Sequence, residues 1–192
     1  MIKIKNVKKY YNHRLILDIP YLEFHPGKIY SIIGKNGIGK STLFRIIFGL
    51  ETYSEGSIEK PSLENIIFNT QKPLFFNGTV KYNLFEPFKL KNLEFPYSYY
   101  ESLIKIFNIE FLQESNIKSL SCGEKAKVQF IRTLLFNKDY LLLDEPTAST
   151  DKETTNLILK YILKEKEKNK CIIIISHNSS GILEISDETI TL

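Results

Sequence analysis

Residues 34–42 read Gly-Lys-Asn-Gly-Ile-Gly-Lys-Ser-Thr. This pattern is typical of a phosphate-binding loop, in which glycines let backbone N–H groups turn toward the phosphates of a nucleotide. The largely apolar run Ile29–Ile33 precedes the loop and Leu43–Phe48 follows it, as expected for a buried strand before the loop and a helix after it. A glycine-rich turn that only caps a helix explains neither the Gly-Lys-Ser ending nor the strand. The stretch therefore predicts a site for ATP or a close relative.

The side chains of this loop have separate expected roles. Lys40 places its ammonium group on the β- and γ-phosphates, and the Ser41 hydroxyl coordinates Mg²⁺. The dipole of the following helix favours the same anionic ligand. The loop residues predicted to bind the nucleotide are Gly34, Asn36, Gly37, Ile38, Gly39, Lys40, Ser41 and Thr42.

The composition is that of an ordinary globular protein. The 192 residues fit one domain, 1–192, and 43% hydrophobic with 25% charged residues is usual for such a domain. The longest aliphatic runs are far shorter than the roughly 20 residues that cross a bilayer, and the N-terminus does not resemble a secretory signal. Two cysteines without metal-ligand spacing suit a reducing compartment. We therefore expect a cytoplasmic protein, and the dispersed net charge of +4 argues against a nucleic-acid partner.

Strand and helix patterns alternate along the chain. Ile2–Val7 and Leu15–Phe24 are strand-like with Asn12-His13 between them, which predicts an antiparallel β layer at the N-terminus. Residues 53–57 have the composition of a loop. Later segments predict a short strand at Ile66–Phe68, buried strands at Tyr140–Leu143 and Ile172–Ser176, and a helix at Lys152–Lys168. Strands that alternate with helices predict an α/β fold with a mainly parallel core sheet.

The middle of the chain has helical spacing. From Thr79 to about Lys118 the apolar residues cluster with this spacing, with Pro87 and Pro96 as breaks, and residues 124–136 form a further helix candidate. We therefore expect a small helical subdomain, about 79–135, inserted in the core.

Two carboxylates follow the buried strand at Tyr140–Leu143. Asp144 and Glu145 come where parallel strands open onto a ligand crevice, so both are expected to face the phosphates. Asp144 is predicted to hold Mg²⁺ and Glu145 to polarise the water that attacks the γ-phosphate. The alternative is a loop that merely begins with acidic residues.

His177 follows the next core strand. From there a ring nitrogen can reach the same crevice and bond to the γ-phosphate, which predicts a catalytic role. A lone histidine is more often structural, and that alternative stays open.

Together these motifs resemble the ATP-binding cassette (ABC) family, the nucleotide-binding subunits of ABC transporters, over nearly the whole chain. Leu120-Ser121-Cys122-Gly123-Glu124 is similar to the family signature LSGGQ. Gln71 resembles the Q-loop glutamine, Ala148-Ser149-Thr150-Asp151 the D-loop, and His177 the switch histidine. Tyr11, six residues before Leu17, resembles the aromatic residue that stacks on adenine, although Tyr10 is adjacent and either ring can stack on a purine or pack on protein.

The resemblance implies a P-loop ATPase of ABC type that works as a homodimer or heterodimer. Ser121 and the backbone N–H of Gly123 would contact the γ-phosphate held by the opposite subunit, so that ATP joins the two. It further implies Gln71 as a catalytic residue and Mg²⁺ ligand, and a dimer interface formed by Ser121, Cys122, Gly123, Glu124 and Asp151. Hydrolysis would then open the dimer and drive a separate membrane permease, with this subunit on the cytoplasmic face of the membrane.

Two signature residues depart from the family pattern. Cys122 replaces a glycine and Glu124 replaces glutamine, which we expect to slow catalysis without abolishing it. Cys122 is either a reactive thiol, because a helix N-terminus favours the thiolate, or an inert small residue. The alternative function is a soluble ABC ATPase that acts on nucleic acid, ribosomes or cofactor assembly. A further alternative is a nucleotide-gated subunit that hydrolyses poorly.

Overall fold

The computed structural model describes residues 1–148, 150–176 and 180–192, which form two compact units. The first unit contains residues 1–68, 138–145 and 159–192, and the second contains residues 69–137 and 146–158. The helix α5 (Lys152–Glu167) begins in the second unit and ends in the first.

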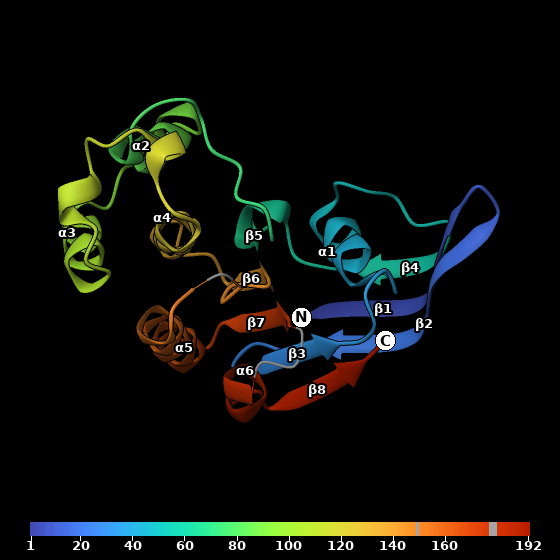
Figure 1. Ribbon diagram of the computed structural model, residues 1–192. Coiled ribbons are helices and arrows are strands. Elements are labelled where there is room, and N and C mark those ends of the chain that lie inside the picture. The colour runs from blue at the N-terminus through green and yellow to red at the C-terminus, as the bar shows by residue number, and fades with distance from the viewer. Residues whose placement is uncertain (149, 177–179) are drawn as a thin grey trace. The chain divides into compact units, whose positions relative to one another are not determined.

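An antiparallel sheet forms the N-terminal part of the first unit. It consists of β1 (Ile2–Tyr11), β2 (Arg14–Phe24) and β4 (Glu55–Glu59) in the order β2-β1-β4 (Figure 1). Asn12 and His13 join β1 to β2 with φ values of 47° and 65°, the left-handed conformation that a two-residue hairpin turn requires. The predicted antiparallel layer is confirmed.

The loop predicted at residues 53–57 is wrong in its second half, because β4 begins at Glu55. Ion pairs to β1 accompany the pairing: Lys5 Nζ lies 3.2 Å from Glu59 Oε1 and Lys8 Nζ lies 3.4 Å from Glu55 Oε2. Opposite charges across an antiparallel pair favour this register. The strand is almost wholly exposed, so it lacks the apolar alternation from which a strand is recognised.

A five-stranded sheet forms the rest of the first unit's β structure. Its order is β5-β6-β7-β3-β8, and the pairs β3–β7, β3–β8 and β6–β7 are parallel. The strands are β3 (Ile29–Ile33), β5 (Ile66–Asn69), β6 (Tyr140–Asp144), β7 (Cys171–Ile175) and β8 (Glu188–Thr191). Every residue of β6 and β7 is buried, which is why both read as continuous apolar runs. The predicted parallel core sheet is confirmed.

The helix α1 (Lys40–Phe48) is held between these two sheets. Leu43 and Phe44 belong to one buried cluster with Ile4 of β1 and with Ile32 and Leu142 of the parallel sheet. The phosphate-loop helix is therefore packed on both sides, which fixes its N-terminus. Short elements complete the unit: η1 (Leu63–Asn65) and α6 (Ser180–Ile185).

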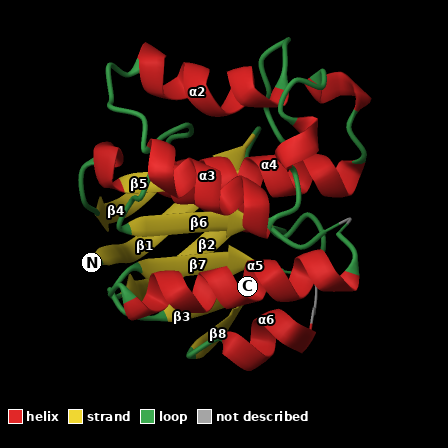
Figure 2. Ribbon diagram, turned by 90° about the vertical axis from the view of Figure 1, so that its left-hand side faces the viewer, coloured by secondary structure: helices red, strands yellow, loops and turns green. Residues whose placement is uncertain are grey.

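The second unit is mainly helical (Figure 2). It contains α2 (Val80–Leu90), α3 (Tyr97–Ile106), α4 (Cys122–Leu135) and the short 3-10 turns η2 (Glu110–Leu112) and η3 (Ile117–Ser119). Stacked rings hold these helices together, with centroids 3.8 Å apart for Phe85–Phe95 and 4.3 Å for Phe88–Phe136.

The prediction that Pro87 breaks a helix is wrong, because Pro87 lies inside α2. Its ring costs the helix one hydrogen bond, and α2 ends three residues later at Leu90. Pro96, by contrast, is the N-cap of α3 and marks a helix boundary as predicted.

Candidate nucleotide site

The phosphate loop connects β3 to α1 through a backbone that requires glycine. Gly34 has φ 153° and Gly39 has φ 108°. A Cβ atom at Gly39 would lie 2.6 Å from Leu17 Cδ2, and one at Gly34 would lie 2.8 Å from the Leu192 carbonyl oxygen. Any larger residue would therefore displace the loop from β2 or from Leu192.

Lys40 folds back over this loop. Its side chain is buried, and Nζ donates to the carbonyl oxygens of Gly34 at 2.7 Å and Lys35 at 3.0 Å. An ammonium group has three donors, so one is left by these two contacts for a phosphate oxygen. The lysine thus holds the loop closed while it adds positive charge at its centre.

The N-terminus of α1 faces the loop without a side-chain cap. Gly39 is the N-cap and offers no side-chain acceptor, and the first turn carries no acidic residue. The first N–H groups of a helix need acceptors, and phosphate oxygens meet that need. Ser41 is partly buried just inside the helix, while Asn36, Gly37 and Ile38 are exposed at the tip of the loop. The donor set of the loop therefore fits a triphosphate.

Asp144 and Glu145 lie at the same edge of the sheet as the loop. The strands β6, β7 and β3 run parallel, so the carboxyl ends of β6 and β3 share an edge. Asp144 is buried at the end of β6, and the Glu145 N–H donates to the Ile175 carbonyl oxygen at 3.0 Å. Glu145 has φ 55°, a conformation that costs a non-glycine residue energy and often marks a functional position. The fold thus brings an acidic pair toward the phosphate site.

The signature residues form the start of α4 in the second unit. Ser121 is the N-cap, and it forms a capping box with Glu124. Glu124 Oε2 accepts from the Ser121 backbone N–H and hydroxyl, both at 2.8 Å, and the first of these bonds is the main reason why the pKa of Glu124 is lowered. Cys122 is exposed and Gly123 partly so, which leaves this helix end accessible.

The other predicted residues are placed as follows. Gln71 is exposed in the second unit, just after Thr70, whose carbonyl oxygen accepts from Gln129 Nε2 at 2.8 Å.

Asp151 is exposed before α5. Its carboxylate accepts from the Thr154 N–H at 2.7 Å, and this bond is the leading cause of the lowered pKa of Asp151. The predicted His177 and the D-loop Ser149 lie outside the described residues.

Tyr11 ends β1 in the first unit and is 41% exposed, with Lys9 Nζ 4.9 Å from its ring centroid. Sequence reasoning missed Lys9. The sequence signal for it is its position two residues after Val7, which places Lys9 on the buried face of the strand.

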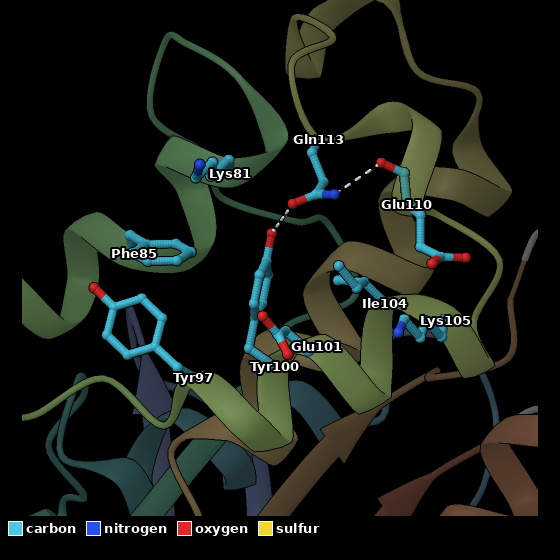
Figure 3. A pocket seen from close by; sticks show the side chains of 9 residues that line it. All are labelled: Lys81, Phe85, Tyr97, Tyr100, Glu101, Ile104, Lys105, Glu110 and Gln113. Atoms are coloured by element: carbon cyan, nitrogen blue, oxygen red, sulfur yellow. Dashed lines mark hydrogen bonds between the residues drawn. The ribbon is translucent and has the colours of Figure 1, made fainter.

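The second unit also contains a pocket of about 560 Å³ between α2, α3 and η2 (Figure 3). Tyr100 donates to Gln113 Oε1, Gln113 Nε2 donates to the Glu110 carbonyl oxygen at 2.9 Å, and burial raises the pKa of Tyr100 to about 12. Among the described residues that line the pocket, none was predicted for the nucleotide site.

Comparison with known proteins decides the family. The model of the ABC transporter family matches residues 17–148. The chain belongs to the ABC transporter family. The match includes the phosphate loop, the signature helix and the acidic pair, so the chain is an ATP-binding subunit with ATPase activity.

Several named proteins are similar in sequence or structure to this ABC ATPase. It is 32% identical over 228 residues to the methionine import ATP-binding protein MetN of Campylobacter jejuni subsp. jejuni, covering 100% of this chain and 68% of that protein. It is 35% identical over 201 residues to the tungstate uptake system ATP-binding protein TupC of Peptoclostridium acidaminophilum, covering 100% and 94%. A solved ATP-binding subunit of an ABC transporter shares the fold with a TM-score of 0.90 at 21% identity, covering 100% of this chain and 85% of that one.

Proposed function

We propose that this ABC ATPase works as a dimer in which each chain completes the nucleotide site of the other. The exposed start of α4 supports this most directly. Its capping box takes up the N–H groups of Ser121 and Glu124 but not those of Cys122 and Gly123, which point to a phosphate site at the positive end of the helix dipole. In this arrangement Ser121 and Gly123 of one chain bind the γ-phosphate held by the loop of its partner. Cys122, Glu124 and Asp151 lie at the same interface.

Mg²⁺ would be held jointly by the protein and the nucleotide. The described residues contain no cluster of three or more His, Cys, Asp or Glu that could bind a metal ion alone. Ser41 and Asp144 of the first unit would supply oxygen ligands, which Mg²⁺ prefers, together with phosphate oxygens. For Gln71 the motif alone implies a ligand role. When bound, the ion would neutralise charge that develops on the phosphates.

Hydrolysis requires a base and a positioned phosphate. Glu145 accepts the proton of the attacking water, and Lys40 stabilises the charge on the γ-phosphate. We assign to His177 a hydrogen bond to this phosphate and to Gln71 a catalytic role, as the motifs imply. Loss of the phosphate removes the contacts across the interface, and the two chains separate.

The motion would power solute uptake through a separate membrane permease, with the ATPase at the cytoplasmic face. No helix within the described residues has the length and apolarity needed to cross a bilayer. The two named relatives serve the import of methionine and of tungstate.

Membrane association distinguishes this function from that of a soluble ABC ATPase that acts on ribosomes or nucleic acid. In a lysate of the source cells, we expect the chain to float with membrane vesicles in a density gradient, and carbonate washing to release it. As a control, the washed vesicles retain integral membrane proteins. Sedimentation with ribosomes, with none in the floating fraction, would support the alternative.

Thiol labelling tests the proposed interface. Cys122 is exposed, whereas Cys171 is fully buried and burial raises the pKa of its thiol to about 12. A maleimide should therefore label the nucleotide-free protein at Cys122 alone. With Mg²⁺ and ATP, a Glu145→Gln form should be labelled severalfold more slowly than the same form without nucleotide, because the phosphate loop of the partner chain covers the Cys122 thiol.

Two variants make the labelling result specific. Cys122→Ala should take up no label, and Cys171→Ala should behave as the parent protein. An unchanged labelling rate in the presence of ATP would argue against the interface. If labelled protein keeps full ATPase activity, Cys122 is an inert residue and not a functional thiol.

A further inference from the structure

Lys9 is a charged residue on the buried face of β1. It is 8% exposed, and it follows Val7, which is fully buried on the same face of the strand. Its ammonium group donates to the Thr52 carbonyl oxygen at 2.6 Å and lies 3.5 Å from Glu51 Oε1. Burying a lysine is costly unless it is paired, so these contacts hold the ammonium group in place.

The same ammonium group lies over the ring of Tyr11. Lys9 Nζ is 4.9 Å from the ring centroid, within the range of a cation–π interaction. The register of the β1–β2 pairing shifts between Lys9 and Tyr10, and the contact with Lys9 places the Tyr11 ring on the Lys9 side of the strand. One face of the Tyr11 ring thus has a fixed neighbour, while 41% of the residue remains exposed.

This face of β1 is the one that meets the phosphate loop. Lys9 pairs with Leu17 across the antiparallel ladder, and residues directly opposite each other share a face. Leu17 is the side chain that a Cβ atom on Gly39 would strike. Lys9 and Tyr11 therefore lie on the same side of the sheet as the nucleotide loop.

A chain of polar contacts continues from Lys9 to that loop. Glu51, which pairs with Lys9, also accepts from Arg45 Nε at 3.2 Å through Oε2. An Arg45 terminal nitrogen donates to Thr42 Oγ1 at 3.3 Å, and Thr42 belongs to the phosphate loop. Polar contacts thus link the loop to the aromatic ring at the end of β1.

We infer that Lys9 is a positioning residue for the nucleotide base: its tethered ammonium group fixes the Tyr11 ring so that the free face of the ring can stack on adenine. The inference rests on the proposed nucleotide-binding function and on the adenine-stacking role that the family resemblance implies for Tyr11. An aromatic ring with a fixed orientation loses less side-chain entropy when the base binds, so the lysine raises affinity without touching the nucleotide.

The competing explanation is structural, since Lys9 also anchors the 51–54 segment to β1. A structural role would affect the loop and the base site together, whereas a positioning role affects only ligands that have a base. ADP and inorganic pyrophosphate separate the two, because both occupy the phosphate loop and only ADP reaches Tyr11. Neither is hydrolysed, so binding is measured without turnover.

Dissociation constants of Mg²⁺–ADP and Mg²⁺–pyrophosphate should be measured by calorimetry, or by displacement of a fluorescent ADP. We expect Lys9→Met to weaken ADP binding about three- to tenfold, the cost of ordering one freed side chain when the base binds, and to leave pyrophosphate binding within about twofold. Lys9→Arg keeps a cation above the ring and should restore ADP binding.

Lys8→Met is the matched control. Lys8 neighbours Lys9 on the same strand and forms an ion pair with Glu55, but it points to the other face. We expect this variant to bind ADP as the parent does. Tyr11→Ala should weaken ADP binding alone, and adding Lys9→Met to it should cause no further loss.

The outcomes separate the inference from the function on which it rests. If Lys9→Met weakens ADP binding and pyrophosphate binding equally, the role is structural and the inference is wrong. The same holds if Lys9→Met weakens ADP binding as much in the Tyr11→Ala protein as in the parent. If Tyr11→Ala weakens ADP binding and Lys9→Met does not, the inference is wrong while the stacking role stands. If Tyr11→Ala leaves ADP binding unchanged, Tyr11 is not the base platform and both are wrong.

Discussion

Replacing Glu145 by Gln should reduce ATP turnover by roughly 10²–10⁴-fold, the usual contribution of a general base. The amide keeps the size and the hydrogen-bonding reach of the side chain but cannot accept a proton. ATP affinity should be preserved, because Lys40 and the N–H groups of α1 are untouched. Phosphate release and a direct binding assay measure the two quantities separately.

Asp139→Asn is the matched control for this variant. Asp139 precedes β6 at the end opposite Glu145, and its backbone carbonyl oxygen, which accepts from the Cys171 N–H, is unaffected by the substitution. Its turnover should equal that of the parent. Glu145→Gln with parental turnover would remove Glu145 from the catalytic machinery.

Replacing Lys40 by Ala should weaken ATP binding by about 10- to 150-fold, because a charge-assisted hydrogen bond is worth about 1.5–3 kcal/mol. The variant also loses the two bonds from Nζ to the carbonyl oxygens of Gly34 and Lys35, so the loop is no longer held closed. Titration with ATP by calorimetry measures the loss.

Lys35→Ala provides the comparison for Lys40→Ala. Lys35 belongs to the same loop and is exposed, and it contributes to the Lys40 contact through its backbone, which alanine retains. We expect at most a small change in ATP affinity. Equal losses for the two variants would mean that positive charge alone, and not the placement of Lys40, determines binding.

The sequence was sufficient for those parts of the fold that depend on local pattern. The loop at residues 34–42, the buried strands β6 and β7 and the helix α4 are each marked by residues that are adjacent in the chain. Apolar runs and glycine spacing are local signals, so the core of the α/β fold and the position of the acidic pair at the end of β6 were predictable.

The errors and omissions involve contacts between distant segments. The pairing of β4 with β1 depends on Lys5 and Glu59, which are far apart in sequence and carry no apolar alternation. The proposed role of Lys9 depends on its contacts with Glu51 and Thr52, which are distant in the sequence and meet it only in the folded chain. Such pairings follow from tertiary packing, which overrides local preference.

The molar mass of the Glu145→Gln form in solution, measured by light scattering after size-exclusion chromatography, tests the proposed dimer in which each chain completes the nucleotide site of the other. We expect twice the mass of the chain with Mg²⁺ and ATP, and the mass of a single chain with Mg²⁺ and ADP. Ser121→Arg should restore the single-chain mass in ATP without loss of nucleotide binding, because it obstructs the exposed start of α4. A Glu145→Gln protein that binds ATP and remains a single chain would contradict the account.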